Sequence, residues 1–73
     1  MKNTLLTEQD IETLESYSEG YFYKILQYIR DFIDTGLKEK RFTQKEAEHD
    51  LEIALWVSYA CNNIDEYEYY YTA

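Results

Sequence analysis

The sequence has no proline, only two glycines and a single cysteine. A lone cysteine cannot form an intramolecular disulfide, so hydrophobic packing has to supply the stability of the fold. The glycines, Gly20 and Gly36, stand far apart, which excludes a glycine-rich phosphate-binding loop. A chain of 73 residues buries only about 60% of its unfolded surface, and a second domain is excluded by length.

Positive charge is also scarce, because seven Lys and Arg stand against fifteen Asp and Glu and give a net charge of −8. Such a chain repels phosphate groups, so neither nucleic acid nor an anionic membrane surface is an expected partner. The longest apolar run is Ile53–Val57, far below the roughly 20 residues of a membrane-spanning helix. Residues Met1–Thr7 lack the apolar core of a signal peptide, and together with the lone thiol this predicts a cytoplasmic protein.

The residues that are abundant are apolar and aromatic, at 45% and 18% of the chain. That composition is too apolar for a disordered segment and predicts one helical domain over residues 1–73. The clearest amphipathic segment runs from Tyr21 to Lys40. Its apolar face has helical spacing and comprises Phe22, Ile25, Leu26, Ile29, Phe32, Ile33 and Leu37.

Helix boundaries can be read from the capping residues. Thr7 with Asp10, and Thr43 with Glu46, have the spacing of capping boxes and predict two helix starts. Ser16–Gly20 predicts a break, with Ser16 or Ser18 as the next N-cap, and Gly36 is a possible early end for the second helix.

The third helix is expected from Gln44 to about Cys61, followed by a turn at Asn62–Asn63 and a fourth, short helix. The expected fold is therefore all-α, a small three- to four-helix bundle built from helical hairpins. Its expected core is Ile11, Leu14, Phe22, Ile25, Ile29, Phe32, Leu51, Ala54, Leu55 and Ser58.

Residues that carry chemistry are few. His49 is the only histidine, and Glu46-x-x-His49 is one half of a pair that di-iron bundles use twice. His49 and Cys61 stand about 18 Å apart along one predicted helix, which excludes a catalytic dyad. We therefore predict no enzymatic activity, no catalytic or metal-binding residues and no cofactor. One enzymatic alternative stays open, a metal site that Glu46, His49 and Asp50 assemble across a symmetry axis.

The candidate partner-binding residues are aromatic, because the chain is rich in aromatic side chains. The segment Ile53–Cys61 is apolar nearly all round, so it must be covered on more than one side. Clustered tyrosines near the end of the chain cannot all face one core, because consecutive helical residues point about 100° apart. Tyrosine is common at interfaces, although half-buried filler is an equally good interpretation. The candidate contact residues are Trp56, Tyr59, Tyr67, Tyr69, Tyr70 and Tyr71.

The stretch Glu46–Ala73 resembles a tetratricopeptide repeat. Ala54, Tyr70 and Ala73 match small, aromatic and small positions of that family in one register, and Ile53 and Val57 match two of its apolar positions. Glu66 departs from the pattern, since it stands at a small position. The resemblance implies a scaffold for protein partners with no catalytic residues, and it implies that this chain is the N-terminal, capping part of a longer helical array.

The sequence thus predicts a non-enzymatic protein–protein interaction module, the N-terminal part of a helical-repeat scaffold. Its expected partner is another protein or downstream helices of the same chain. A homodimer through the apolar half of the third helix and the tyrosine-rich tail is also open. The alternative function is a standalone acidic protein that mimics nucleic-acid charge, with regularly spaced carboxylates on Glu8, Glu12, Glu15 and Glu19.

Overall fold

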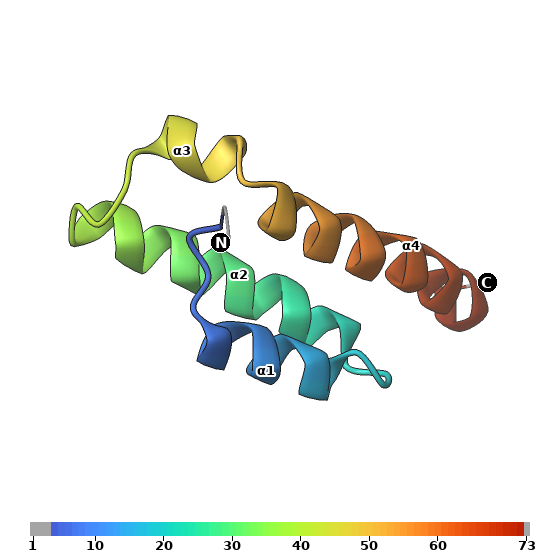
Figure 1. Cartoon of the computed structure of the whole chain (residues 1–73). Helices are drawn as coiled ribbons and strands as arrows, with labels where there is room; N and C mark the ends of the chain where they lie inside the picture. The colour runs from blue at the N-terminus through green and yellow to red at the C-terminus, as the bar shows by residue number, and fades with distance from the viewer. Residues whose placement is uncertain (1–3, 73) are drawn as a thin grey trace.

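The computed structural model describes the backbone of residues 4–72 and the side chains of residues 4–64, and no strand occurs within that backbone. Its helices are α1 (Glu8–Tyr17), α2 (Phe22–Lys38), α3 (Gln44–Glu48) and α4 (Leu51–Thr72). The main packed pairs are α2 with α4 and α1 with α2 (Figure 1). The predicted fold class, a small all-helical bundle, is confirmed.

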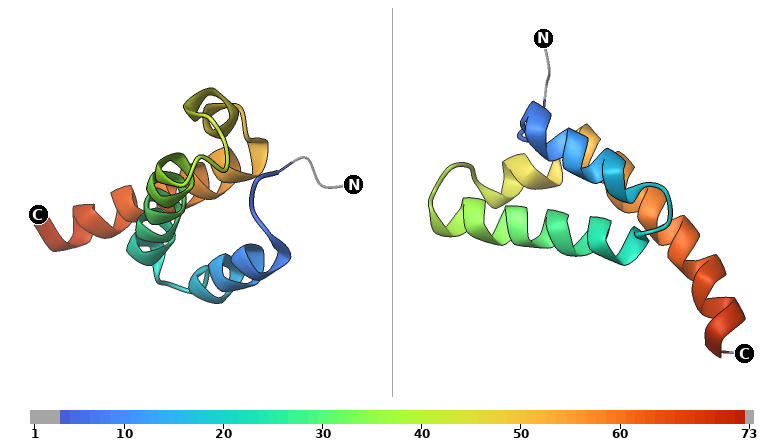
Figure 2. Two further views of the ribbon diagram at one scale, coloured as in Figure 1. Left: turned by 90° about the vertical axis from the view of Figure 1, so that its left-hand side faces the viewer. Right: turned by 90° about the horizontal axis from the view of Figure 1, so that it is seen from below.

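The bundle is elongated, with extents of 41 × 21 × 17 Å along its principal axes. The length comes from α4, whose C-terminal turns extend past the connection between α1 and α2 (Figure 2). The short helix α3 lies beside the C-terminal half of α2 (Figure 1). Among the described side chains of α4, those of Ile53, Ala60 and Ile64 are buried in the bundle.

The core lies where α1, α2 and α4 meet. Leu14 of α1 and Ile25 of α2 have no exposed surface. They form one cluster with Leu6, Ile29, Ile53 and Ala60. The predicted core residues Ile11, Phe22 and Phe32 are partly buried against this cluster.

Both predicted capping boxes are confirmed. The Asp10 N–H donates to Thr7 Oγ1 at 3.1 Å, and the Thr7 N–H donates back to Asp10 Oδ2 at 2.9 Å. Thr43 and Glu46 repeat the arrangement at 3.2 and 2.9 Å. Each box satisfies two N–H groups that a helix start leaves without partners. These caps fix where α1 and α3 begin.

The predicted break after α1 is confirmed, but its capping residue is not. Gly20 has a φ of 131°, a conformation that favours glycine over other residues. The chain can therefore reverse between α1 and α2. Tyr21 is the N-cap of α2 and forms no side-chain capping bond, so the prediction of Ser16 or Ser18 in that role is wrong.

Gly36 does not end α2, because the helix continues to Lys38. The glycine serves packing: a Cβ there would overlap the ring of Phe42, which is buried and stacks on Phe32 with centroids 5.5 Å apart. The helix ends instead with Lys40 in the left-handed region at φ 58°. The Arg41 N–H then donates to the Gly36 carbonyl at 2.8 Å, which completes a Schellman-type end.

The predicted third helix is two helices, because the chain turns between Glu48 and Leu51. His49 caps the C-terminal end of α3. Asp50 then starts α4, since its Oδ1 accepts from the N–H groups of Glu52 and Ile53 at 3.0 and 3.1 Å. The predicted turn at Asn62–Asn63 is wrong, since α4 runs through both residues.

The predicted core face of the third helix is also wrong. Leu51 and Leu55 are 75% and 65% exposed, and Ala54 and Ser58 are exposed as well. The face of α4 that enters the core carries Ile53, Ala60 and Ile64. The turn at Asp50 fixes this orientation, because it starts a new helix axis that does not continue the faces of α3.

A hydrogen bond joins α1 to α2 through a charged group. The Tyr28 hydroxyl donates to Asp10 Oδ1 at 2.5 Å. Burial favours a higher pKa for Asp10, but the bonds from Tyr28 and from Thr7 lower the pKa below the usual 3.8. The bond to Asp10, followed by burial, raises the pKa of Tyr28 above 10.0.

We expect Tyr28→Phe to lower the free energy of unfolding by about 1 kcal/mol at neutral pH, because it removes this bond. The contribution of Asp10 is complete above pH 3.8 and is lost as the pH falls through its lower folded pKa. The contribution of Tyr28 is complete below pH 10.0 and is lost as the pH rises through its higher folded pKa. Urea unfolding of both proteins across pH 2–12 tests this, and equal pH profiles would contradict it.

Candidate functional site

The first half of α4 carries an exposed apolar surface. Leu51, Leu55 and Tyr59 are 75%, 65% and 40% exposed, and they follow one another at intervals of four residues on one helical face. Trp56 lies next to them and is half-buried. We call Leu51, Leu55, Trp56 and Tyr59 the α4 stripe. Leucines that are so exposed side by side are unusual on a domain with so little core.

The aromatic end of the stripe is also part of the fold. The Tyr59 hydroxyl donates to the Ser18 carbonyl oxygen at 2.8 Å, which ties α4 to the turn after α1. The Tyr59 ring lies edge-to-face against Phe22 and Trp56, with centroids 5.6 and 6.0 Å apart. The Trp56 indole N–H donates to Glu52 Oε1 at 3.1 Å. These contacts hold both rings in fixed positions at the edge of the stripe.

A shallow groove of about 400 Å³ runs along this edge. It is lined by Ser18, Glu52, Leu55, Trp56 and Tyr59. Its surface therefore combines an aromatic pair held by the fold, one exposed leucine and one carboxylate. Rigid aromatic groups beside an apolar side chain are typical of the central part of protein interfaces.

The structure brings together two of the predicted contact residues, Trp56 and Tyr59. The side chains of the other four, Tyr67, Tyr69, Tyr70 and Tyr71, lie outside the described residues. Sequence reasoning missed Leu51 and Leu55 as contact residues, because it placed them in the core. One signal was present for the start of α4, because Asp50 is a strong N-cap residue, but a helix start does not select which face is buried.

Asp50 connects the stripe to the rest of the protein. It is the one buried charged residue in the part of the chain with described side chains, at 5% exposure. Besides capping α4, it accepts from the Thr4 hydroxyl at 2.8 Å and from the Leu5 N–H at 2.5 Å. Leu6 follows directly and is buried. These bonds therefore hold residues 4–6, which we call the N-terminal arm, against the start of α4.

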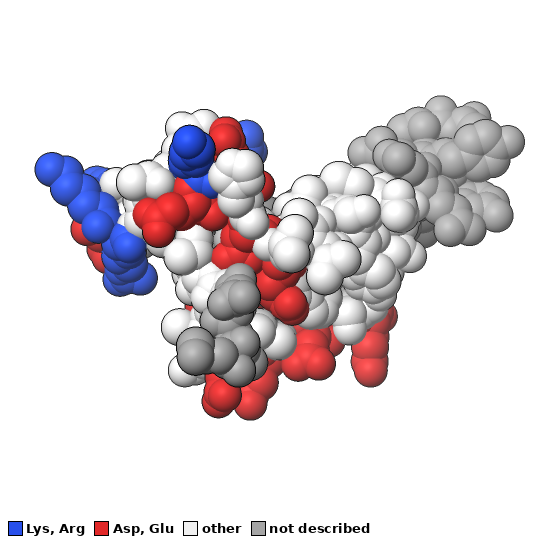
Figure 3. Space-filling model, turned by 45° about the horizontal axis from the view of Figure 1, so that its top comes forward, with Lys and Arg blue, Asp and Glu red and all other residues white. Residues whose placement is uncertain are grey.

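Charge is unevenly distributed over the surface. Lys and Arg side chains gather at the end where α2 leads into α3, and an uncharged area covers α4 (Figure 3). The basic end consists of Lys38, Lys40, Arg41 and Lys45. Acidic side chains form a patch beside this uncharged area and line the lower edge of the view (Figure 3). On the face shown, negative charge therefore borders part of the uncharged α4 surface.

The residues that the sequence offers for metal binding form helix caps in the structure. Glu46 belongs to the capping box of Thr43, Asp50 caps α4, and His49 caps α3. Cys61 is exposed. Within the part of the chain that the structure describes, no group of three or more His, Cys, Asp or Glu could hold a metal ion.

No helix in the described part of the chain has the length and apolar character needed to cross a membrane. No family model, curated protein or solved structure matches this chain.

Proposed function

We propose that this chain is a non-enzymatic protein-interaction module whose contact surface is the α4 stripe. The observation that carries the proposal is the exposure of Leu51 and Leu55 beside the fixed rings of Trp56 and Tyr59. Burying one exposed leucine contributes about 2 kcal/mol, so a partner that covers both gains substantially.

The occupant of the stripe, in this proposal, is a further helix. The stripe runs along one helical face, and a helix pairs with such a face by inserting its side chains between those of the stripe. That helix belongs either to another protein or to a longer helical scaffold of which these residues form the N-terminal part. In such a stack, each layer of helices covers the apolar face that the preceding layer leaves exposed.

The test is a double variant, Leu51→Ser with Leu55→Ser, compared with Gln9→Ser and Gln27→Ser, which alters two exposed neutral residues on α1 and α2. We expect the leucine variant to unfold at the same urea concentration as the parent protein and to lose partners that the parent protein captures from its source cells. The glutamine variant should retain them. Capture that is equal in all three proteins would contradict the proposal.

A second candidate function is the mimicry of nucleic-acid charge, which one observation favours: Glu8, Glu12, Glu15 and Glu19 are all exposed along α1 and the turn after it. A basic nucleic-acid-binding protein would then be the partner. Its binding should weaken steeply with salt and with substitution of these four residues by glutamine. Binding that persists unchanged at high salt would exclude this function.

A further inference from the structure

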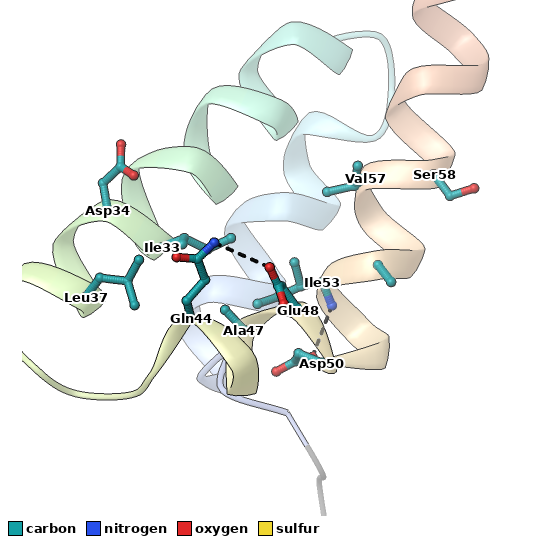
Figure 4. Close-up of a pocket in the computed structure, with 11 residues that line it drawn as sticks. Ile33, Asp34, Leu37, Gln44, Ala47, Glu48, Asp50, Ile53, Val57 and Ser58 are labelled. Atoms are coloured by element: carbon teal, nitrogen blue, oxygen red, sulfur yellow. Dashed lines mark hydrogen bonds between the residues drawn. The ribbon is translucent and has the colours of Figure 1, made fainter.

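A second groove lies on the other side of α4 and is separate from the α4 stripe. It has a volume of about 630 Å³ and opens between α2, α3 and the start of α4 (Figure 4). Its apolar lining includes Ile33 and Leu37 from α2, Ala47 from α3, and Ile53 and Val57 from α4. The groove exists because the turn at Asp50 redirects α4 away from the axis of α3, so that α3 does not close over α2.

The charged residues that line the groove are all acidic. Asp34 of α2 and Glu48 of α3, both exposed, line it from two different helices (Figure 4). The Gln44 amide donates to Glu48 Oε1 at 3.3 Å, which keeps that carboxylate beside the groove. No Lys or Arg is among the residues that line it. An apolar floor lined by carboxylates matches an apolar ligand face that is flanked by positive charge.

We propose that this groove binds an amphipathic helix of another protein that carries Lys or Arg on both flanks of its apolar face. The fit follows the usual arrangement of a helix in a groove, in which side chains at i, i+3, i+4 and i+7 enter the apolar floor. The flanking cations then lie next to Asp34 and Glu48. The site is distinct from the α4 stripe and does not depend on the function proposed for it.

A second copy of this chain does not supply such a helix. Neither Glu8–Tyr17 nor Leu51–Thr72 contains a Lys or Arg. The helix α2 does carry basic residues, but Ile25 and Ile29 of its apolar face are buried in its own core. The net charge of −8 further opposes self-association. Charge and burial together therefore indicate a different, basic partner.

The probe is a fluorescein-labelled synthetic helix of about four turns, with leucines on one face and lysines on both flanks. A matched peptide has glutamates in place of the lysines. Measured by fluorescence anisotropy with the full chain, the lysine peptide should bind about tenfold more tightly, because its two surface ion pairs are replaced by like-charge contacts in the glutamate peptide. Failure of the lysine peptide to bind at millimolar concentration would overturn the proposal.

Two pairs of variants locate the binding. Asp34→Lys with Glu48→Lys should remove the preference for the lysine peptide, whereas Glu12→Lys with Asp31→Lys changes the net charge equally at exposed positions outside the groove and should preserve it. Ala54→Trp, at an exposed position of the groove wall, should block binding without disturbing the core. An equal loss in both lysine double variants would show that net charge alone attracts the peptide and would overturn the proposal.

Loss of binding in Leu55→Ser with full binding in Ala54→Trp would also overturn it, because the peptide would then lie on the α4 stripe. That result would leave the function proposed for the stripe in place. A concentration-dependent dimer in sedimentation that Ala54→Trp abolishes would instead assign the groove to a second copy, and would equally overturn the proposal.

Discussion

Replacing Asp50 with alanine is expected to lower the free energy of unfolding by about 3 kcal/mol, since it removes the N-cap of α4 and the acceptor for the N-terminal arm together. The Glu52 and Ile53 N–H groups lose their cap, and the Thr4 hydroxyl and Leu5 N–H lose their shared partner. In a protein with so small a core, this is a large part of the total stability. Urea unfolding followed by circular dichroism measures the change.

Two further variants separate the roles of this carboxylate. Asp50→Asn retains one side-chain oxygen for the cap and loses one acceptor for the arm, so its expected destabilisation is smaller than that of Asp50→Ala. Asp31→Ala, at an exposed position on α2, should change the stability by less than about 0.5 kcal/mol. If Asp50→Ala were as mild as Asp31→Ala, the assignment of Asp50 as the junction of arm and helix would be wrong.

The second large effect is expected at Ile53, which is 5% exposed and belongs to the core cluster. Ile53→Ala should lower the free energy of unfolding by about 3 kcal/mol, through lost burial and the cavity that remains. Leu55→Ala removes a side chain of similar size only two positions away. Because Leu55 is 65% exposed, the expected change there is below about 0.5 kcal/mol.

This pair measures the orientation of α4 directly. Equal losses at both positions would mean that the leucine face is also buried, and the α4 stripe would then be part of the core. A larger loss of stability in Leu55→Ala than in Ile53→Ala would mean that the face with Leu51 and Leu55 is the buried one, as the sequence pattern suggested. Thermal unfolding of the two variants under the same buffer conditions is sufficient to distinguish these outcomes.

Local signals in the sequence predicted the helix starts that depend on a few neighbouring residues. Thr7 with Asp10 and Thr43 with Glu46 form capping boxes within four positions of the chain, so no tertiary contact is needed to identify them. The apolar face of α2 was also predictable, because its opposite face is polar. Ile25 and Ile29 are buried as the periodicity indicated.

The orientation of α4 was not predictable from periodicity, because its first half has apolar residues on every side. Leu51 with Leu55, and Ile53 with Val57, have equally good helical spacing. Tertiary context selects between them: the arm bound by Asp50 and the packing on α2 place Ile53 inside. The same context keeps α4 helical through Asn62 and Asn63, although asparagine often ends helices.

The candidate site was predictable only in its aromatic part. Trp56 and Tyr59 were expected as contact residues because aromatic side chains are favoured at interfaces, and the structure places their rings together. Leu51 and Leu55 depend on the orientation of the helix, so no composition argument finds them. The groove beside α3 depends on the turn at Asp50 and was not anticipated.

The most direct test of the α4 stripe as a contact surface is site-specific photocrosslinking in the source cells. A benzophenone amino acid replaces Leu55 in one protein and Glu12, exposed on α1, in a second protein. The account predicts a discrete crosslinked product from position 55 that disappears when Leu51→Ser is added, and no such product from position 12. No product from position 55, or the same products from both positions, would contradict it.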